Sequence, residues 1–251
     1  MSKIELTHGK DYFSPSQLKK LFVSIGAFKS YLSREYTSSK QMDLGTAVHM
    51  MLLEPLKYSE TYVYIDDSEI CSQIGGKRPT ATKLYAEWYE KILSENVGKV
   101  LLSKEQVDIL EKIKTNCDTT GVSDTFFTDG EAEKTVTGVA SGFDEDFDAL
   151  CIIDYDTDFM SIDLKTTSKP LSKFKWDAND LGYDIQAAVT KSINNKDFVF
   201  VVVQTVAPYD IGVFTTSEYF MNRGVDKVNT ALNNYKFYSN DNCSQVLTFE
   251  L

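Results

Sequence analysis

Residues 161–167 read Ser-Ile-Asp-Leu-Lys-Thr-Thr, and this short stretch decides both the fold and the chemistry that we expect. Side chains alternate between the two faces of a β-strand, so Asp163 and Lys165 would share one face. Ile162 and Leu164 would then point into the core. A carboxylate and an ammonium placed in this way can hold a cation and a reacting water side by side. The pair alone is weak evidence, because exposed strands often carry Asp-x-Lys.

The segment before this strand ends in the acidic sequence 154–158, Asp-Tyr-Asp-Thr-Asp, which we interpret as a turn. A hairpin centred at Tyr155-Asp156 would place Asp148 directly opposite Asp163, with the facing Cβ atoms about 5 Å apart. Two carboxylates that close repel each other unless a cation lies between them, which makes them good Mg²⁺ ligands.

Two alternatives to this assignment follow from the same residues. A slip of two residues in the hairpin would put Asp146 in the place of Asp148. The acidic turn also matches the start of an EF-hand loop, but such a loop needs Gly at its sixth position and Glu at its twelfth. Those positions are Phe159 and Lys165 here. We therefore reject calcium binding at the turn.

The formal net charge of −11 is unusual for a protein that binds nucleic acid, and its distribution matters more than its sum. Residues 131–163 hold ten acids against one base, Lys134, whereas residues 1–40 hold seven Lys and Arg against three acids and residues 165–196 hold six against three. An acidic patch between two basic segments suits a cation site beside surfaces that bind phosphate, although scattered solvated charge is the alternative. A DNA track or a plain exposed face could include Lys19, Lys20, Lys29 and Arg34.

The length and composition favour one domain, which we place at residues 1–251. The longest apolar run, 198–203, is too short to cross a bilayer, and the first residues carry no apolar stretch typical of a secretory signal. The four cysteines form no CxxC pair, which argues against a zinc, redox or clustered iron–sulfur site. We therefore expect a cytoplasmic protein without a membrane segment.

Hydrophobic periodicity divides the chain into a mainly helical part, 1–130, and an α/β core, 131–251. The first helix is predicted to begin at Ser14-Pro15-Ser16-Gln17, a capping box with Pro at the first helical position, and to break near Gly26. Further helices are predicted at Asp43–Glu54, Thr80–Glu95, Ser103–Cys117, Leu181–Ile193 and Ser217–Tyr235. Strands are predicted at Glu133–Val139, Phe143–Ile153, Phe159–Lys165, Phe198–Val206 and Ile211–Thr215.

Three motifs in a fixed order resemble the PD-(D/E)XK nuclease superfamily, specifically the RecE-type (exodeoxyribonuclease VIII-like) exonucleases of phages and prophages. They are LGTAVH at 44–49 followed by LLEP at 52–55, IDLKTT at 162–167, and GYDIQAA at 182–188. A weaker fourth match is VVVQTVAPYDIGV at 201–213, so the resemblance extends from about Tyr12 to Phe214. Each motif alone is unspecific, but the three together in this order are not.

The resemblance implies a restriction-endonuclease-like fold, in which a mixed β-sheet is flanked by helices, and a metal site. Mg²⁺, for which Mn²⁺ can substitute, would be held by His49, Asp148, Asp163 and the carbonyl of Leu164. Lys165 would position or help deprotonate the attacking water, and Gln186 would orient the site or touch the DNA backbone. Glu133 is a further candidate acid. The chain departs from its relatives at Thr190, where they often carry Tyr.

The same resemblance implies an exonuclease that degrades one strand of linear double-stranded DNA, in the 5′ to 3′ direction, and leaves single-stranded tails for recombination. It would bind DNA ends as a ring-like homo-oligomer, with a single-strand annealing protein as a candidate partner. The alternatives are a PD-(D/E)XK endonuclease, or a catalytically silent module of the same fold that binds DNA ends or protein.

Gly45 lies one turn before His49 on the predicted helix Asp43–Glu54. Because glycine has no side chain, this face of the helix could approach the strands that carry the acids.

Overall fold

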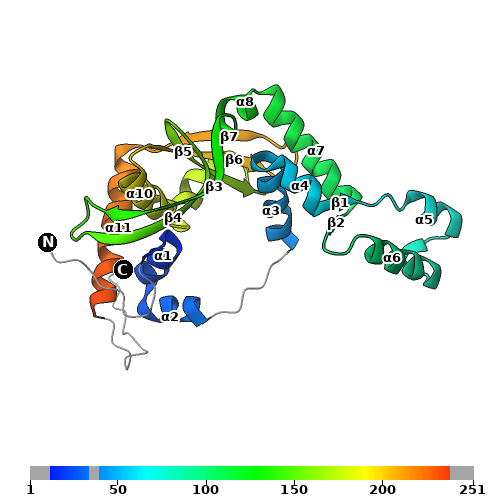
Figure 1. The fold of residues 1–251 in the computed structure, drawn as a ribbon, viewed down its shortest axis with the longest axis horizontal. Coiled ribbons are helices and arrows are strands. Elements are labelled where there is room, and N and C mark those ends of the chain that lie inside the picture. Colours follow the sequence, from blue (N-terminus) through cyan, green and yellow to red (C-terminus); the bar gives the residue numbers. More distant parts are fainter. Residues whose placement is uncertain (1–11, 34–39, 238–251) are drawn as a thin grey trace.

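In a computed structural model of the protein, residues 12–33 and 40–237 are described. Five strands form one mixed sheet in the order β3-β4-β5-β6-β7, in which β5 and β6 are parallel and the other neighbours antiparallel (Figure 1). The strands are β3 (Gly130–Ala140), β4 (Phe147–Thr157), β5 (Met160–Thr167), β6 (Asp197–Gln204) and β7 (Ile211–Thr215). This sheet with helices on both faces confirms the expected α/β fold.

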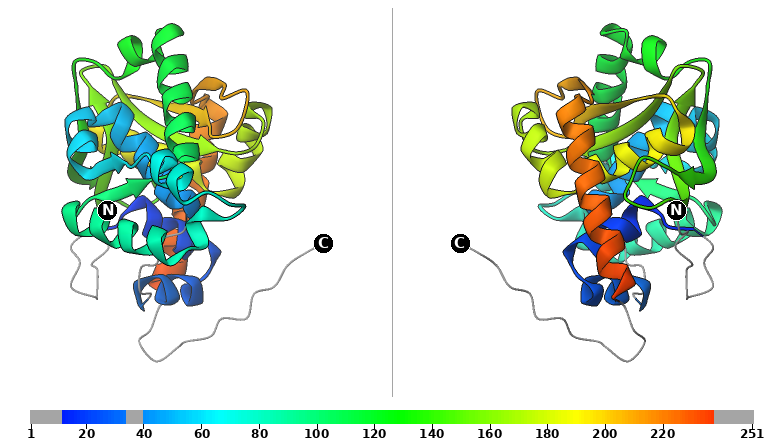
Figure 2. Two further views of the ribbon diagram at one scale, coloured as in Figure 1. Left: turned by 90° about the vertical axis from the view of Figure 1, so that its right-hand side faces the viewer. Right: turned by 90° about the vertical axis from the view of Figure 1, so that its left-hand side faces the viewer.

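One face of the sheet is covered by helices from both ends of the described chain (Figure 2). They are α1 (Pro15–Val23), α2 (Ile25–Ser33), α10 (Tyr183–Asn194) and α11 (Glu218–Lys236). Leu18 and Leu21 of α1 are fully buried in the same core cluster as Phe147 of β4. The N-terminal helices are therefore part of the sheet's own core rather than a separate cap.

The start of α1 follows the predicted capping box. The Gln17 N–H donates to Ser14 Oγ at 3.3 Å, and the Ser14 N–H donates to Gln17 Oε1 at 2.8 Å. Just before this cap, the Phe13 N–H donates to the Asp148 carbonyl at 2.8 Å, which attaches the chain to β4. The cap and this attachment fix where α1 lies on the sheet.

The opposite face is covered mainly by α3 (Lys40–Leu53) and α7 (Lys104–Thr119), with the short α4 (Pro55–Thr61) and α8 (Val122–Phe126) beside them. Ile162 and Leu164 of β5 are fully buried under these helices, as the alternation in the decisive strand predicted. Strand β6 is buried on both faces: Val201 contacts this cluster, while Phe200 packs toward the short helix α9 (Phe174–Asp180) and α10. The continuous apolar run 198–203 thus forms an internal strand of the sheet, covered on both faces.

A helical arm extends from this body, to the right in Figure 1. It starts at a parallel pair of short strands, β1 (Tyr62–Tyr64) and β2 (Val100–Leu102), and carries α5 (Ser68–Ile74), a 3₁₀ turn (Pro79–Ala81) and α6 (Lys83–Glu95). No residue of α5 or α6 is buried. The sequence predicted α6 but neither α5 nor the two strands. Among the described helices, none has both the length and the apolar character needed to span a membrane.

Candidate metal centre and active site

The hairpin that joins β4 to β5 has a different register from the one that we predicted. Tyr155 pairs with Ile162 and Asp156 pairs with Ser161, so the turn lies at residues 158–159. The Thr157 hydroxyl closes this turn because it accepts two main-chain hydrogen bonds, from the N–H of Phe159 at 3.3 Å and from the N–H of Met160 at 3.1 Å. The acidic sequence 154–158 is therefore mostly strand, and the interpretation of it as a turn was wrong.

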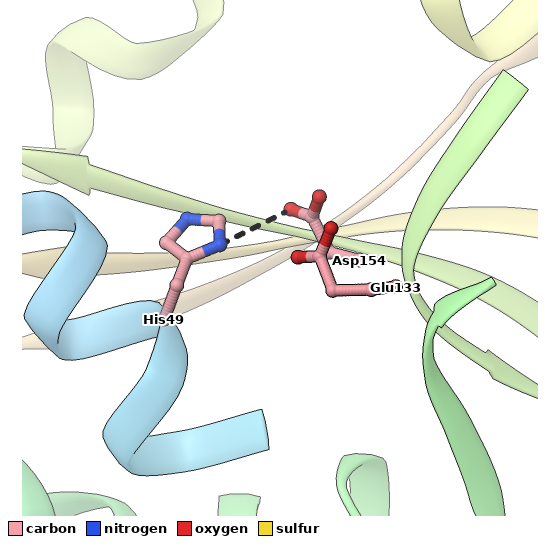
Figure 3. A group of neighbouring side chains, drawn as sticks. All are labelled: His49, Glu133 and Asp154. Carbon is pink, nitrogen blue, oxygen red and sulfur yellow. Dashed lines mark ion pairs between the residues drawn. The ribbon is translucent and has the colours of Figure 1, made fainter. Parts of the chain in front are cut away.

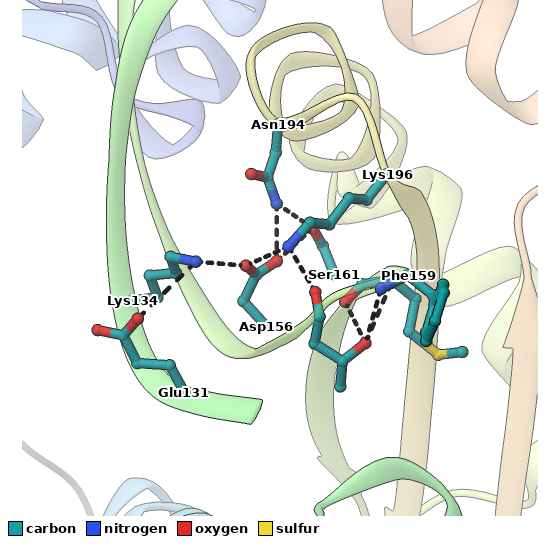
Figure 4. Close-up of polar contacts among 9 residues, drawn as sticks. Glu131, Lys134, Asp156, Phe159, Ser161, Asn194 and Lys196 are labelled. Atoms are coloured by element: carbon teal, nitrogen blue, oxygen red, sulfur yellow. Dashed lines mark hydrogen bonds and ion pairs between the residues drawn. The ribbon is translucent and has the colours of Figure 1, made fainter. Parts of the chain in front are cut away.

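Asp156 explains why this register is favoured. Its side chain is buried and is surrounded by donors from three other segments (Figure 4). Lys134 and Lys196 each contact Oδ2, at 2.8 and 2.7 Å, while Asn194 and Ser161 donate to Oδ1 at 2.7 and 3.2 Å. Burial alone would raise the pKa of Asp156, but these hydrogen bonds outweigh it and hold the pKa below its usual range. The carboxylate stays charged and holds the end of the hairpin together.

In this register Asp148 does not face Asp163. Asp148 lies opposite Val139 of β3, near the start of β4, and six residues before Asp154. Six residues of strand span about 20 Å. Asp146 lies before β4 begins and is no closer. The predicted pairing of Asp148 with Asp163, and the alternative through Asp146, are both wrong because the hairpin turns three residues later than expected.

Asp154 occupies the place that we had assigned to Asp148. The β4–β5 ladder ends at the pair Tyr155 and Ile162, and the next position along brings Asp154 beside Asp163. There the two strands separate, and Asp154 Oδ2 accepts the main-chain N–H of Leu164 at 2.8 Å. Burial, then the nearby charge of Asp163, raise the pKa of Asp154 to about 7. This carboxylate thus has an unfavourable charge that a cation would relieve.

His49, Glu133 and Asp154 converge from α3, β3 and β4, and one ligand atom from each lies within 4.8 Å of the others (Figure 3). Glu133 is the β3 residue opposite Asp154, between the ladder pairs of Ala132 and Lys134. It has a φ of 53°, a left-handed conformation that is rare for a residue with a side chain. Such strain persists where the surroundings enforce it and is frequent at functional sites. Glu133 was predicted only as a further candidate acid, whereas the structure places it in the cluster.

His49 reaches the cluster because α3 lies close to β5. A Cβ atom at Gly45 would come within 3.1 Å of Thr166 Oγ1, so the missing side chain permits the approach that we expected. His49 Nδ1 lies 3.7 Å from Asp154 Oδ2. Burial, then the charge of Lys165, lower the pKa of His49 to about 4. The ring is therefore neutral near pH 7, so this contact is not a salt bridge there and the imidazole can act as a metal ligand.

Asp163 and Lys165 form the second half of the site and share one face of β5, as predicted. Asp163 is buried; its Oδ1 accepts a hydrogen bond from Gln186 Nε2, and Lys165 Nζ lies at ion-pair distance from its Oδ2. Burial alone would lower the pKa of Lys165, but Asp163 and Asp154 outweigh it and raise the pKa to about 12. Lys165 is therefore a fixed positive charge beside the carboxylates.

These residues fit a divalent cation. Three acidic side chains, Glu133, Asp154 and Asp163, lie near one another with one ammonium group, that of Lys165, between them and the hollow described below. A hydrogen bond with the Leu164 backbone raises the pKa of His49 but does not outweigh burial. The main chain of Leu164 therefore also borders the cluster. One neutral imidazole nitrogen among several hard oxygens suits Mg²⁺ or Mn²⁺.

A hollow of about 460 Å³ opens beside Lys165. Its other polar lining consists of the hydroxyl groups of Thr166, Thr167, Ser168 and Thr205 and of Lys169, whose ammonium is paired with Asp177 at 2.7 Å. The rings of Phe174 and Tyr183 line the hollow together with aliphatic side chains. Hydroxyls, ammonium groups and aromatic rings are the side chains that contact phosphates and bases of a nucleic-acid strand.

The sequence and the fold are similar to known proteins. The sequence model of the family described as "PDDEXK-like domain of unknown function (DUF3799)" matches residues 14–244. A crystal structure from Eubacterium rectale, described as a "Putative exonuclease", has a TM-score of 0.57 and 15% identity and covers 99% of this chain and 96% of that chain. A phage related exonuclease from Haemophilus somnus 129PT has a TM-score of 0.31 and 13% identity, over 70% of this chain and 95% of that chain. No curated protein matches the sequence.

Proposed function

The chain belongs to the PDDEXK-like family DUF3799, and from that premise we propose that it is a divalent-metal-dependent exonuclease acting on one strand of linear double-stranded DNA. The observation that supports this most is the meeting of two groups of residues where β4 and β5 separate. His49, Glu133 and Asp154 form one group, and Asp163 with Lys165 forms the other. Carboxylates, an imidazole and a fixed ammonium in one place are what metal-assisted phosphodiester hydrolysis requires.

We assign the metal to His49, Glu133, Asp154 and Asp163, with the Leu164 carbonyl as a further oxygen. Asp154 replaces Asp148 in this assignment, because only Asp154 lies beside Asp163. Mg²⁺ is the proposed ion and Mn²⁺ the substitute. When bound, the cation supplies Lewis-acid activation of a water and of the phosphoryl oxygen.

Lys165 and Gln186 have separate roles in this proposal. Because the pKa of Lys165 is raised to about 12, the ammonium orients the attacking water and offsets the negative charge that develops on the phosphate, rather than removing a proton. Gln186 orients the site: its amide contacts Asp163 Oδ1 while Lys165 contacts Oδ2, so the carboxylate is held in one orientation beside the proposed cation. We place the DNA strand in the hollow beside Lys165, where Lys169 and the hydroxyl groups would contact phosphates.

The finer features of the reaction follow from the resemblance to RecE-type exonucleases. We propose 5′ to 3′ digestion that leaves single-stranded tails for recombination, by a ring-like homo-oligomer that encloses the DNA. A single-strand annealing protein is the proposed partner for those tails. The enzyme would act where phage or bacterial DNA is found, in the cytoplasm of the cell.

The test is digestion of end-labelled linear duplex DNA with and without Mg²⁺, beside covalently closed circular DNA of the same sequence. Progressive, metal-dependent shortening of the linear duplex with survival of the circle is the expected result. Nicking or linearisation of the circle at a comparable rate would favour the endonuclease. Absence of cleavage together with absence of Mn²⁺ binding in calorimetry would favour the silent binding module.

A further inference from the structure

Lys19 of α1 contacts the proposed active site from a segment 167 residues away in the sequence. Its Nζ donates a hydrogen bond to Gln186 Oε1 at 3.3 Å, and the opposite end of the same amide, Nε2, donates to Asp163 Oδ1. Three side chains from α1, α10 and β5 are thus connected in one line. From this arrangement we propose that Lys19 is a positioning residue that acts through Gln186 on Asp163. The inference rests on the proposed function, and it adds a residue to the machinery of that site.

The chemistry of the three groups allows only one direction for this line. A lysine ammonium can only donate hydrogen bonds, an ionised carboxylate can only accept them, and an amide has one end of each kind. With Oε1 held by Lys19, the amide directs its NH₂ group at Asp163 Oδ1. Without Lys19, Oε1 loses its donor in a half-buried site and the side chain is free to turn toward solvent. Lys19 therefore holds Gln186 against Asp163 and so fixes the orientation of that carboxylate.

The surroundings of Lys19 are fitted to its side chain. A Cβ atom at Gly182 would lie 3.2 Å from Lys19 Cγ, so the glycine at the start of α10 makes room for the lysine stem. The Tyr183 ring lies 4.9 Å from Lys19 Nζ and 5.1 Å from Lys165 Nζ, measured to its centroid. Burial, then the charge of Lys165, lower the pKa of Lys19 to about 8. A lysine with such surroundings differs from a solvated surface charge.

The neighbouring residue provides a matched control. Lys20 lies on the same helix, carries the same charge and is exposed to solvent. Replacing either lysine by methionine removes one positive charge and keeps the length of the side chain. A difference between Lys19→Met and Lys20→Met therefore reports the position of Lys19 and not the net charge of the protein or of α1.

Kinetics give the first readout, on full-length protein with saturating Mg²⁺ and linear duplex. Lys19→Met should lower kcat by about tenfold to a hundredfold, the usual cost of losing a partner that orients a metal site, whereas Lys20→Met should keep the wild-type kcat. Because Lys19 acts through Gln186, the double variant Lys19→Met/Gln186→Met should be no slower than Gln186→Met alone. Effects that multiply in the double variant, or equal kcat for the two lysine variants, would overturn the inference.

A second readout does not need an active enzyme. In metal-free, ¹⁵N-labelled protein, the side-chain NH₂ signals of Gln186, identified by their loss in Gln186→Met, should shift or broaden in Lys19→Met and stay unchanged in Lys20→Met. Unchanged signals in both lysine variants would overturn the inference even if the wild type proves inactive. An inactive wild type with the expected spectra would contradict only the proposed function. If Lys19→Met does not fold, Lys19→Ala, which also removes the donor to Gln186 Oε1, carries the same predictions, with Lys20→Ala as its control.

Discussion

Asp154 and Asp163 lie side by side at the point where β4 and β5 separate. There the main-chain N–H of Leu164 donates a hydrogen bond to the Asp154 side chain, at Oδ2, and not to the main chain of β4. Each acid is fixed by different partners: Asp154 by this main-chain bond, and Asp163 by Gln186 and Lys165. Ligand atoms of Glu133 and His49 also lie within 4.8 Å of Asp154. The separation of two strands thus makes room for a cation in an otherwise packed sheet.

Lys165→Met should separate turnover from metal binding. The variant keeps the carboxylates and the imidazole but loses the positive charge beside the reacting phosphate. We expect Mn²⁺ binding, measured by calorimetry, to change little, while kcat falls about a hundredfold or more. Lys169→Met, which removes a solvent-exposed lysine from the same hollow, is the matched control and should mainly weaken DNA binding. A wild-type kcat in Lys165→Met would mean that its ammonium takes no part in the reaction.

The metal-free protein should show two opposing pH effects on its stability. The pKa of Asp154 is raised from 3.8 to about 7, so ionising this residue destabilises the folded state. The stability that the protonated Asp154 contributes is therefore lost as the pH rises from 3.8 to about 7. The pKa of His49 is lowered from 6.5 to about 4, so the folded state favours the neutral ring. The stability that the neutral ring contributes is lost as the pH falls from 6.5 to about 4. In the wild type the two effects oppose each other between about pH 4 and 6.5.

Single variants should separate the two effects. The measurement is the free energy of unfolding from pH 4 to 7, with a chelator present to keep the protein free of metal. Relative to wild type, Asp154→Asn should gain stability as the pH rises, because the unfavourable carboxylate is absent. His49→Gln should lose stability over the same range, because only the carboxylate effect remains. A shift of both variants in the same direction would contradict the assigned protonation states.

His49→Ala tests whether the helical half of the chain contributes to the metal site. Loss of a neutral nitrogen ligand should weaken Mn²⁺ affinity and cleavage, and a higher metal concentration should restore part of the activity. His8, which lies outside the described residues, serves as the control, since His8→Ala should behave as wild type. Equal effects of the two substitutions, or no effect from His49→Ala, would mean that α3 only covers the sheet.

The parts of the fold that were predicted correctly depend on local signals. Strand β7 has the predicted bounds, and the Ser14 capping box starts α1, because alternation and capping involve residues a few positions apart. The face shared by Asp163 and Lys165 follows from the two-residue period of a strand alone. The motif that contains His49 and Gly45 likewise predicted that α3 would approach β5.

The hairpin register could not be predicted in the same way, because distant residues determine it. Asp156 looked like a turn residue, and donors from other segments, Lys134 and Lys196 among them, make it a stable part of a strand. One local signal was available: the hydroxyl of Thr157 can accept the N–H of Phe159, which favours a turn after that threonine. The contact of Lys19 with Gln186 joins segments whose proximity depends on the whole fold.

The most direct test of the central assignment compares Asp154→Asn with Asp148→Asn in Mg²⁺-dependent digestion of end-labelled linear duplex. Both variants replace one aspartate of the same strand by its amide, but only Asp154 lies in the cluster with His49 and Glu133. We predict that Asp154→Asn, folded as judged by its circular dichroism, loses at least about a hundredfold in cleavage, while Asp148→Asn digests DNA at close to the wild-type rate. An active Asp154→Asn protein, or an inactive but folded Asp148→Asn protein, would contradict the account.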